Sequence, residues 1–334
     1  MRVKASITVL SAAIIGFAMV PSVPSSSQAA DPEILTISGA GPQGRWFKEA
    51  SLFGKILTRE MKEKTVNGVT GKGVSVGNLK RIAFKKIDAG RFYLMDMEYA
   101  HTKAAPFFSD GKDYSNAVVW MKLGTHLFRV VSGLDTKTYS DLKGKTVAIG
   151  AKNSGDDLIA LRILKGYGIT HDTANLKYLA RSDGQNAFTN HQVDAIAFLY
   201  ARNNQGHLGP IFAARPVGKS ADFVKPDPDK NAAFLASDKT FFLDKFGEPA
   251  FGRPDLQGIA VSQGMAIRND LSEDLVYRMT KTLYENWDEV LKSAPWWKGP
   301  NEASLESGPS ITTVPYHAGS MRYFKEKGVW QKYH

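Results

Sequence analysis

The chain has 334 residues, a formal net charge of +10 and no cysteine. The lack of cysteine excludes disulfides, thiolate metal ligands and cysteine nucleophiles, and it fits an oxidising compartment. Hydrophobic residues make up 43% of the sequence, which is enough to bury the cores of two ordinary domains. The lysines and arginines are scattered and form no basic stripe with exposed aromatic residues, so no nucleic-acid partner is expected. Attraction of anionic solutes is an alternative role for the net positive charge.

The first segment has the features of a secretory signal. Arg2 and Lys4 precede an uncharged, largely apolar run over 7–20, and small residues follow at 27–30. The run is too short to cross about 30 Å of hydrocarbon, so a membrane anchor is not expected. We therefore predict a signal peptide over residues 1–29 and release of the mature chain into the periplasm.

Short β-like runs followed by helical patterns predict an α/β fold with largely parallel sheets. The predicted strands are 34–38, 74–76, 127–132, 146–150, 176–179, 195–199 and 259–267. The predicted helices are 48–61, 157–165 and 272–292, with Asp270 and Glu273 as a capping box for the last. Residues 218–229 and 293–315, rich in proline and in either charged or small residues, are interpreted as surface loops.

Two domains would account for this order of elements. Chain crossings near Gly133 and Gly252 divide the sequence into one lobe of residues 31–132 and 252–334 and a second lobe of residues 133–251. Ligands of such folds bind in the crevice outside the carboxyl ends of the strands.

The first strand-to-helix loop, Gly39 to Trp46, contains the pattern G-x-G-x-x-G. A dinucleotide site also needs an acidic residue about 20 residues further on, at the end of the next strand, and the sequence has none there. We therefore predict no nicotinamide cofactor. Glycines let the backbone approach a ligand, and free N–H groups at a helix start attract an anion. An inert glycine turn is the alternative.

Two further predicted loops also place small or polar residues directly before a helix. One is Val74 to Asn78, and the other is Gly150 to Asp156. For the third loop, Ser154 or Asp156 could act simply as an N-cap.

Enzyme templates are not found. There is no G-x-S-x-G or HExxH motif, and the seven histidines have no ligand spacing. His317 is interpreted as part of a structural turn rather than as a catalytic base. A carboxylate pair is not excluded by the sequence.

Several ordered motifs together resemble one receptor family. Residues 139–150 read YSDLKGKTVAIG and lead into Ser154-Gly155. Further support comes from residues 193–195, 274–286 and 317–328. With these motifs the chain resembles the TAXI family of solute receptors for TRAP transporters, from about Ile34 to Tyr333.

The resemblance implies a type II periplasmic binding protein fold, with two α/β lobes around a central ligand cleft. It implies a monomeric receptor without catalytic activity or cofactor, which captures a small organic anion, such as a carboxylate or an acidic amino acid, and delivers it to a TRAP-type membrane permease. Alternatives are an exported accessory protein or hydrolase that reuses the fold, and a sensory receptor for a membrane kinase.

The expected ligand site combines the three loops. Arg45 stands where the family tends to have threonine, and we expect it to pair with a carboxylate of the ligand in bidentate fashion. Ser75 and Asn78 would supply neutral hydrogen bonds, and Trp46 with Tyr200 would cover apolar parts. The predicted ligand-binding residues are Gly41, Gln43, Gly44, Arg45, Trp46, Ser75, Val76, Asn78, Asn153, Ser154, Gly155, Asp156 and Tyr200.

Overall fold

The computed structural model describes residues 31–42, 44–71, 74–104, 107–152, 154–201, 208–245, 247–294, 314–328 and 330. The strands are β1 Ile34–Ser38, β2 Thr65–Val69, β3 Ala89–Tyr93, β4 Ala117–Ser132, β5 Thr146–Ala148, β6 Asn175–Lys177, β7 Ala195–Ala201, β8 Asp222–Val224, β9 Phe241–Lys245 and β10 Gln257–Arg268.

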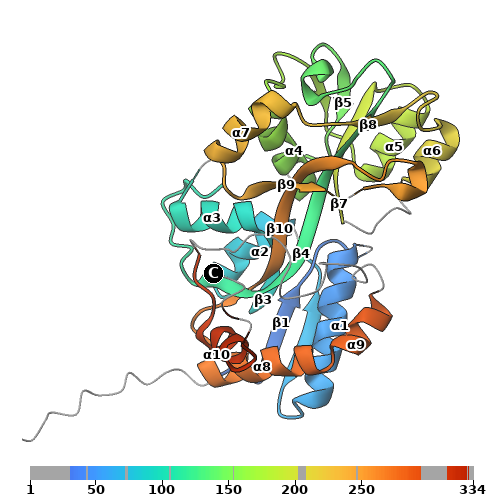
Figure 1. Ribbon diagram of the computed structural model, residues 1–334. Coiled ribbons are helices and arrows are strands. Elements are labelled where there is room, and N and C mark those ends of the chain that lie inside the picture. Colours follow the sequence, from blue (N-terminus) through green and yellow to red (C-terminus); the bar gives the residue numbers. More distant parts are fainter. Residues whose placement is uncertain are drawn as a thin grey trace, which may run out of the picture. The chain divides into compact units, whose positions relative to one another are not determined.

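The helices alternate with these strands through most of the chain (Figure 1). They are α1 Arg45–Glu60, α2 Val74–Ala83, α3 Leu94–Thr102, α4 Gly155–Gly166, α5 Arg181–Thr189, α6 Gly209–Ala214, α7 Pro228–Ser237, α8 Glu273–Glu285, α9 Trp287–Ser293 and α10 Ala318–Glu326. Among the helices in the described part of the chain, none combines the length and the apolar character that a membrane span needs.

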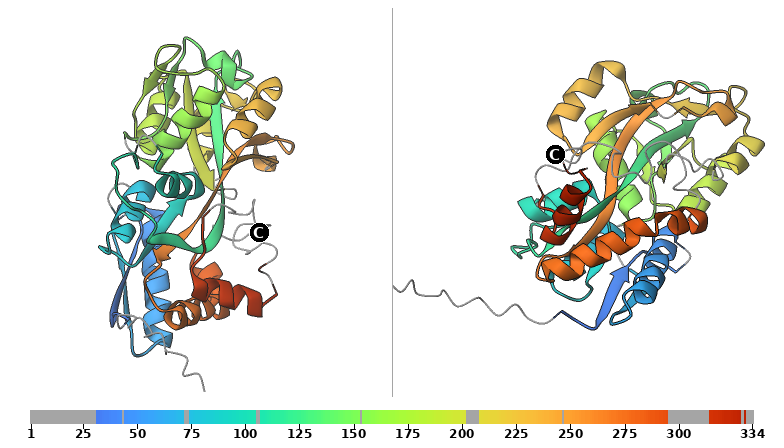
Figure 2. Two further views of the ribbon diagram at one scale, coloured as in Figure 1. Left: turned by 90° about the vertical axis from the view of Figure 1, so that its left-hand side faces the viewer. Right: turned by 60° about the horizontal axis from the view of Figure 1, so that its bottom comes forward.

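The sheet is mixed rather than largely parallel. Its strand order is β2-β1-β3-β10-β4-β7-β5-β6, with β8 beside β4 and β9 beside β10. Parallel pairs occur at both ends, but β10 runs antiparallel to β3 and β4, and β4 runs antiparallel to β7. The long strands β4 and β10 lie side by side in every view (Figures 1 and 2). The α/β prediction is therefore confirmed, and the prediction of largely parallel pairing is wrong where these strands cross the sheet.

The prediction of a strand at 74–76 is wrong. Residues Val74 to Ala83 form α2, and the strands that pair with β1 are β2 and β3. Ser75, Asn78, Leu79 and Ile82 are all buried, and this spacing is that of one helix face. The two β-branched valines favoured a strand, but burial of the helical face decided the outcome.

The strand predicted at 127–132 is only the end of β4. Every residue of β4 is buried, so the strand has no alternation of polar and apolar residues to mark its full length. The loop predicted at 218–229 contains β8 and the start of α7. Most of the loop predicted at 293–315 lies outside the described residues.

The helix predicted at 272–292 is divided into α8 and α9 at Asn286. Its N-cap is Ser272, whose Oγ accepts a hydrogen bond from the N–H of Leu275 at 3.1 Å. The predicted capping box is therefore wrong. Asp270 instead pairs with Arg268 at 2.9 Å, because the two side chains are close at the end of β10.

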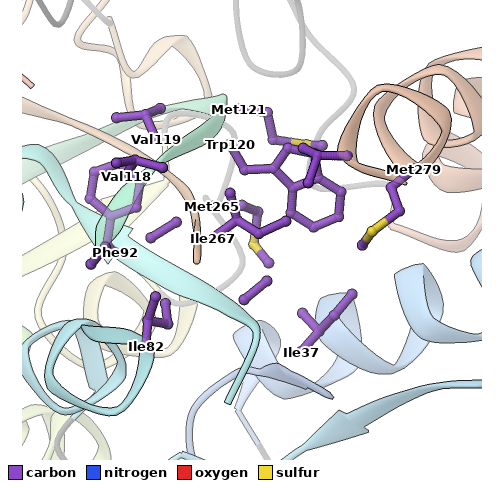
Figure 3. Packing of buried hydrophobic residues seen from close by; sticks show 14 of the residues in the cluster. Ile37, Ile82, Phe92, Val118, Val119, Trp120, Met121, Met265, Ile267 and Met279 are labelled. Carbon is purple, nitrogen blue, oxygen red and sulfur yellow. The ribbon is translucent and has the colours of Figure 1, made fainter. Parts of the chain in front are cut away.

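The buried side chains form three clusters. The largest packs β1, β3 and the adjoining parts of β4 and β10 against helices that include α1 and α8. Figure 3 shows Trp120, Met265 and Met279 within it, and the Trp120 indole also donates to Thr280 Oγ1 at 2.9 Å. The other two clusters draw mainly on residues 128–261. The predicted lobe boundaries stay a prediction.

Candidate ligand-binding site

The first predicted loop leads into α1 without a side-chain cap. Gly44 is the N-cap, and its N–H donates to the carbonyl of Gly41 at 2.8 Å. Gly39 packs so closely that an added Cβ would lie 2.4 Å from the backbone of the first turn of α1. Gly41 is exposed, and Gln43 lies outside the described residues. The loop therefore has the bare backbone at a helix start that suits an anion.

Arg45 and Trp46 begin α1 and differ in their surroundings. Trp46 is buried, and its ring lies 5.1 Å from that of Tyr93. The guanidinium group of Arg91 lies 5.1 Å from the Trp46 ring centroid, a cation–π arrangement. Trp46 thus packs on other protein groups, whereas Arg45 is half-buried at the loop.

The second predicted loop is the first turn of α2, where Ser75 and Asn78 are fully buried. The Oγ of Ser75 accepts a hydrogen bond from the N–H of Tyr93 at 2.9 Å. The Asn78 amide donates to the carbonyls of Gly39 at 2.9 Å and Arg91 at 3.0 Å. These two side chains hold the first loop and the end of β3 together. Their neighbour Val76 is partly buried and packs on the largest hydrophobic cluster.

The third predicted loop caps α4. The Oγ of Ser154 accepts a hydrogen bond from the N–H of Asp157 at 3.3 Å, as the N-cap alternative requires. Gly155 follows it, and a Cβ added there would lie 2.7 Å from the ring of Tyr93. Asn153 lies outside the described residues. The starts of α1 and α4 are thus brought to the same residue, since Trp46 and Gly155 both contact Tyr93.

Asp156 and Tyr200 share one partner, Arg181 of α5. Arg181 Nη2 lies 2.8 Å from Asp156 Oδ2 and donates to the carbonyl of Leu199 at 2.6 Å. Its guanidinium group lies 4.9 Å from the ring centroid of Tyr200. The buried Tyr200 hydroxyl accepts a hydrogen bond from Gln185 at 3.2 Å. The carboxylate of Asp156 is therefore held in an ion pair beside the loop.

Two buried ion pairs were not found by reasoning from the sequence. Arg91 Nε lies 3.3 Å from Glu49 Oε2, with both side chains only 1% exposed. Arg129 Nη2 lies 2.6 Å from Glu248 Oε1, with both side chains fully buried. The available signal was an arginine inside a strand of mostly apolar residues, because such a charge is rarely buried without a partner.

Besides burial, the charges of four arginines lower the pKa of His126. We call these residues the central arginine cluster: Arg45, Arg91, Arg129 and Arg181. Burial first, and then the charges of this cluster, hold the pKa of His126 well below its usual range. Burial raises the pKa of Tyr93, so its hydroxyl keeps its proton, and it forms a hydrogen bond with His126 Nδ1 at 2.9 Å. His126 is therefore neutral.

The central arginine cluster, the backbone at the start of α1 and the capped start of α4 converge around Tyr93 and His126. Within the described residues, no group of three or more His, Asp or Glu side chains is placed to hold a metal ion. His317 is the N-cap of α10, since its Nδ1 accepts from the N–H of Gly319 at 3.1 Å, and it has the structural role that we predicted.

A model of the NMT1-like family matches residues 37–328, and the chain belongs to this family. XAC2383 from Xanthomonas citri, solved with ATP, is similar with a TM-score of 0.52 and 12% identity over 90% of this chain and 98% of that chain. PhnD1 from Prochlorococcus marinus, solved with methylphosphonate, is similar with a TM-score of 0.50 and 12% identity over 90% of this chain and 100% of that chain.

The periplasmic aliphatic sulphonate binding protein SsuA from Escherichia coli aligns with a TM-score of 0.41 and 16% identity over 80% of this chain and 78% of that chain. The chain has the mixed α/β fold of periplasmic binding proteins, as predicted.

Proposed function

We propose that the chain is a periplasmic receptor that reversibly binds a small organic anion and delivers it to a membrane permease. The observation that carries the proposal is the start of α1, where the half-buried guanidinium group of Arg45 lies at a helix start without a side-chain cap. Positive charge with little surrounding water favours an anion strongly, because the low dielectric weakens screening. Binding of this kind makes and breaks no covalent bond.

Arg45 is the proposed direct contact to the ligand. It is half-buried at the end of the glycine loop, where it begins α1 at a helix start without a side-chain cap. A guanidinium group pairs with two oxygens of a carboxylate, sulfonate or phosphonate at once. Two proteins of similar fold were solved with phosphorus oxyanions, ATP and methylphosphonate, so these acids belong in the test beside carboxylates.

The first experiment is a thermal-shift screen of the mature protein against carboxylates, acidic amino acids, sulfonates and phosphonates. A ligand that binds only the folded state should raise the melting temperature with its concentration. Native mass spectrometry of freshly purified protein would weigh any ligand that remains bound. The proposal fails if no anion moves the transition while the protein turns over ester or amide substrates.

The permease is proposed to be of the TRAP type, from the resemblance of residues 139–150 and 317–328 to TAXI receptors. Such a permease is driven by an ion gradient. Uptake that depends on this receptor should therefore stop when the gradient is collapsed with ATP held constant. Uptake that depends on the ATP concentration instead would indicate an ATP-driven permease. The proposal that the receptor binds an anion would not be affected by that result.

A further inference from the structure

A pocket lies between α3 and α4. Its volume is about 190 Å³. Met95, Tyr99, Phe107, Leu158 and Leu161 provide most of its lining. These side chains are largely apolar, so the pocket suits a ring or a short hydrocarbon chain. An apolar cavity of roughly 150 Å³ is large enough to hold benzene in an engineered protein.

The carboxyl group of Asp96 is the polar feature of this pocket. Asp96 is 1% exposed and lines the pocket. Its Oδ2 has no hydrogen-bond partner among the residues that the structure describes. The Ser75 side chain of α2 lies beside the carboxyl group. Buried polar atoms in proteins almost always have a partner, so an unmatched one at a pocket wall marks a place for a ligand group.

The charges around the pocket restrict the class of ligand. Burial raises the pKa of Asp96 to about 7, so near neutral pH and below the group can both donate and accept a hydrogen bond. Arg162 and the exposed Lys165 complete the lining and disfavour a cation. Arg162 is already paired with Asp238 at 2.8 Å and lies over the Tyr99 ring. A hydroxyl group is the neutral partner that matches a protonated carboxyl group.

We propose that the pocket between α3 and α4 is a second binding site, for a small neutral apolar molecule with one hydroxyl group that hydrogen-bonds to Asp96. This site is separate from the anion site, since its lining comes from α3, α4 and Phe107 and includes none of the residues predicted to bind the anion. It does not depend on the proposed receptor function.

The test is a titration of the full mature protein with 4-fluorophenol, followed by fluorine NMR at pH 6. We expect a saturable shift with one site per chain. Leu161→Trp should abolish the shift by filling the pocket, whereas Leu243→Trp, which places an indole at an exposed position of β9, should leave it unchanged.

Two variants of Asp96 test the hydrogen bond. Asp96→Leu should weaken binding at least tenfold, and Asp96→Asn, which keeps a donor and an acceptor, should stay within about threefold of the wild-type affinity. Melting curves of each variant show whether it is folded. The proposal is overturned if no saturable shift occurs in the wild type, if the shift survives Leu161→Trp, or if a folded Asp96→Leu binds as well as the wild type.

Discussion

The hydroxyl of Tyr93 lies 2.9 Å from Nδ1 of His126, which joins the end of β3 to the middle of β4. The same tyrosine ring packs on Trp46 of α1 and leaves no room for a side chain at Gly155 of α4. One residue therefore links the helix starts of the first and third predicted loops. Changes at these contacts should alter ligand binding before they alter the rest of the fold.

Gly155→Ala should disturb this junction. The new Cβ would lie 2.7 Å from the Tyr93 ring, closer than real contacts allow, so either the ring or the start of α4 must shift. We expect at least a tenfold loss of anion affinity by calorimetric titration. Gly209→Ala is the matched control, because nothing lies within 4 Å of its new Cβ. Equal affinities for the wild type and Gly155→Ala would show that this contact does not position the site.

Arg45→Ala should remove the proposed direct contact with the ligand. Truncation of a desolvated bidentate pair costs about 2 to 5 kcal/mol, so the affinity should fall by roughly thirtyfold or more. The melting temperature of the ligand-free protein should change little. Lys48→Ala removes the same charge from an exposed position of the same helix and should have a small effect. Affinities within threefold for Arg45→Ala and the wild type would place Arg45 outside the site.

Glu248→Gln should destabilise the protein, because it leaves the fully buried Arg129 without its carboxylate. Loss of one partner of a buried pair costs about 3 to 5 kcal/mol. The matched control is Glu289→Gln, which breaks the exposed pair with Arg59 and should cost at most about 1 kcal/mol. Urea denaturation measures both differences. Similar losses for the two variants would contradict the predicted role of burial.

Asp96→Asn should make stability less sensitive to pH. Burial raises the folded-state pKa of Asp96 from 3.8 to about 7, so the folded state holds a proton that the unfolded state releases. This contribution is fully present below pH 3.8 and is lost as the pH rises to about 7. At pH 8 the variant should therefore exceed the wild type in stability by an amount on the order of 4 kcal/mol, at about 1.4 kcal/mol per pKa unit.

Comparing the wild type and Asp96→Asn at two pH values separates the titration of Asp96 from that of the other groups. Histidines and surface groups titrate alike in both proteins, so their contributions cancel in the difference. At pH 4 the wild type and Asp96→Asn should have nearly equal free energies of unfolding. A difference that is the same at pH 4 and pH 8 would mean that Asp96 is ionised in the folded protein.

Anion binding should also compact the protein. A ligand can favour closure only through contacts that the open form lacks. Small-angle scattering of the mature protein should therefore show a smaller radius of gyration at saturation. An unchanged radius would indicate a rigid unit in place of the two lobes predicted at residues 31–132 with 252–334 and at residues 133–251.

The sequence by itself determined the α/β class, β1 with its limits and the approximate positions of α1 and α4. These elements have local signals: an apolar run beside a glycine loop, an apolar stripe at helical spacing, and a capping serine. The structural role of His317 was also predictable, since its turn is encoded by near neighbours.

Only the tertiary structure decided the long strand β4, the helical state of Val74 to Ala83 and the chemistry at the centre of the site. β4 is buried on both faces, which removes the alternation that marks a strand in a sequence. Arg91 and Glu49 are 42 positions apart, and Arg129 and Glu248 are 119 positions apart. Pairing across such distances depends on the tertiary structure that brings α1 to β3 and the segment between β9 and β10 to β4, because a buried charge is stable only where the fold brings its partner to it.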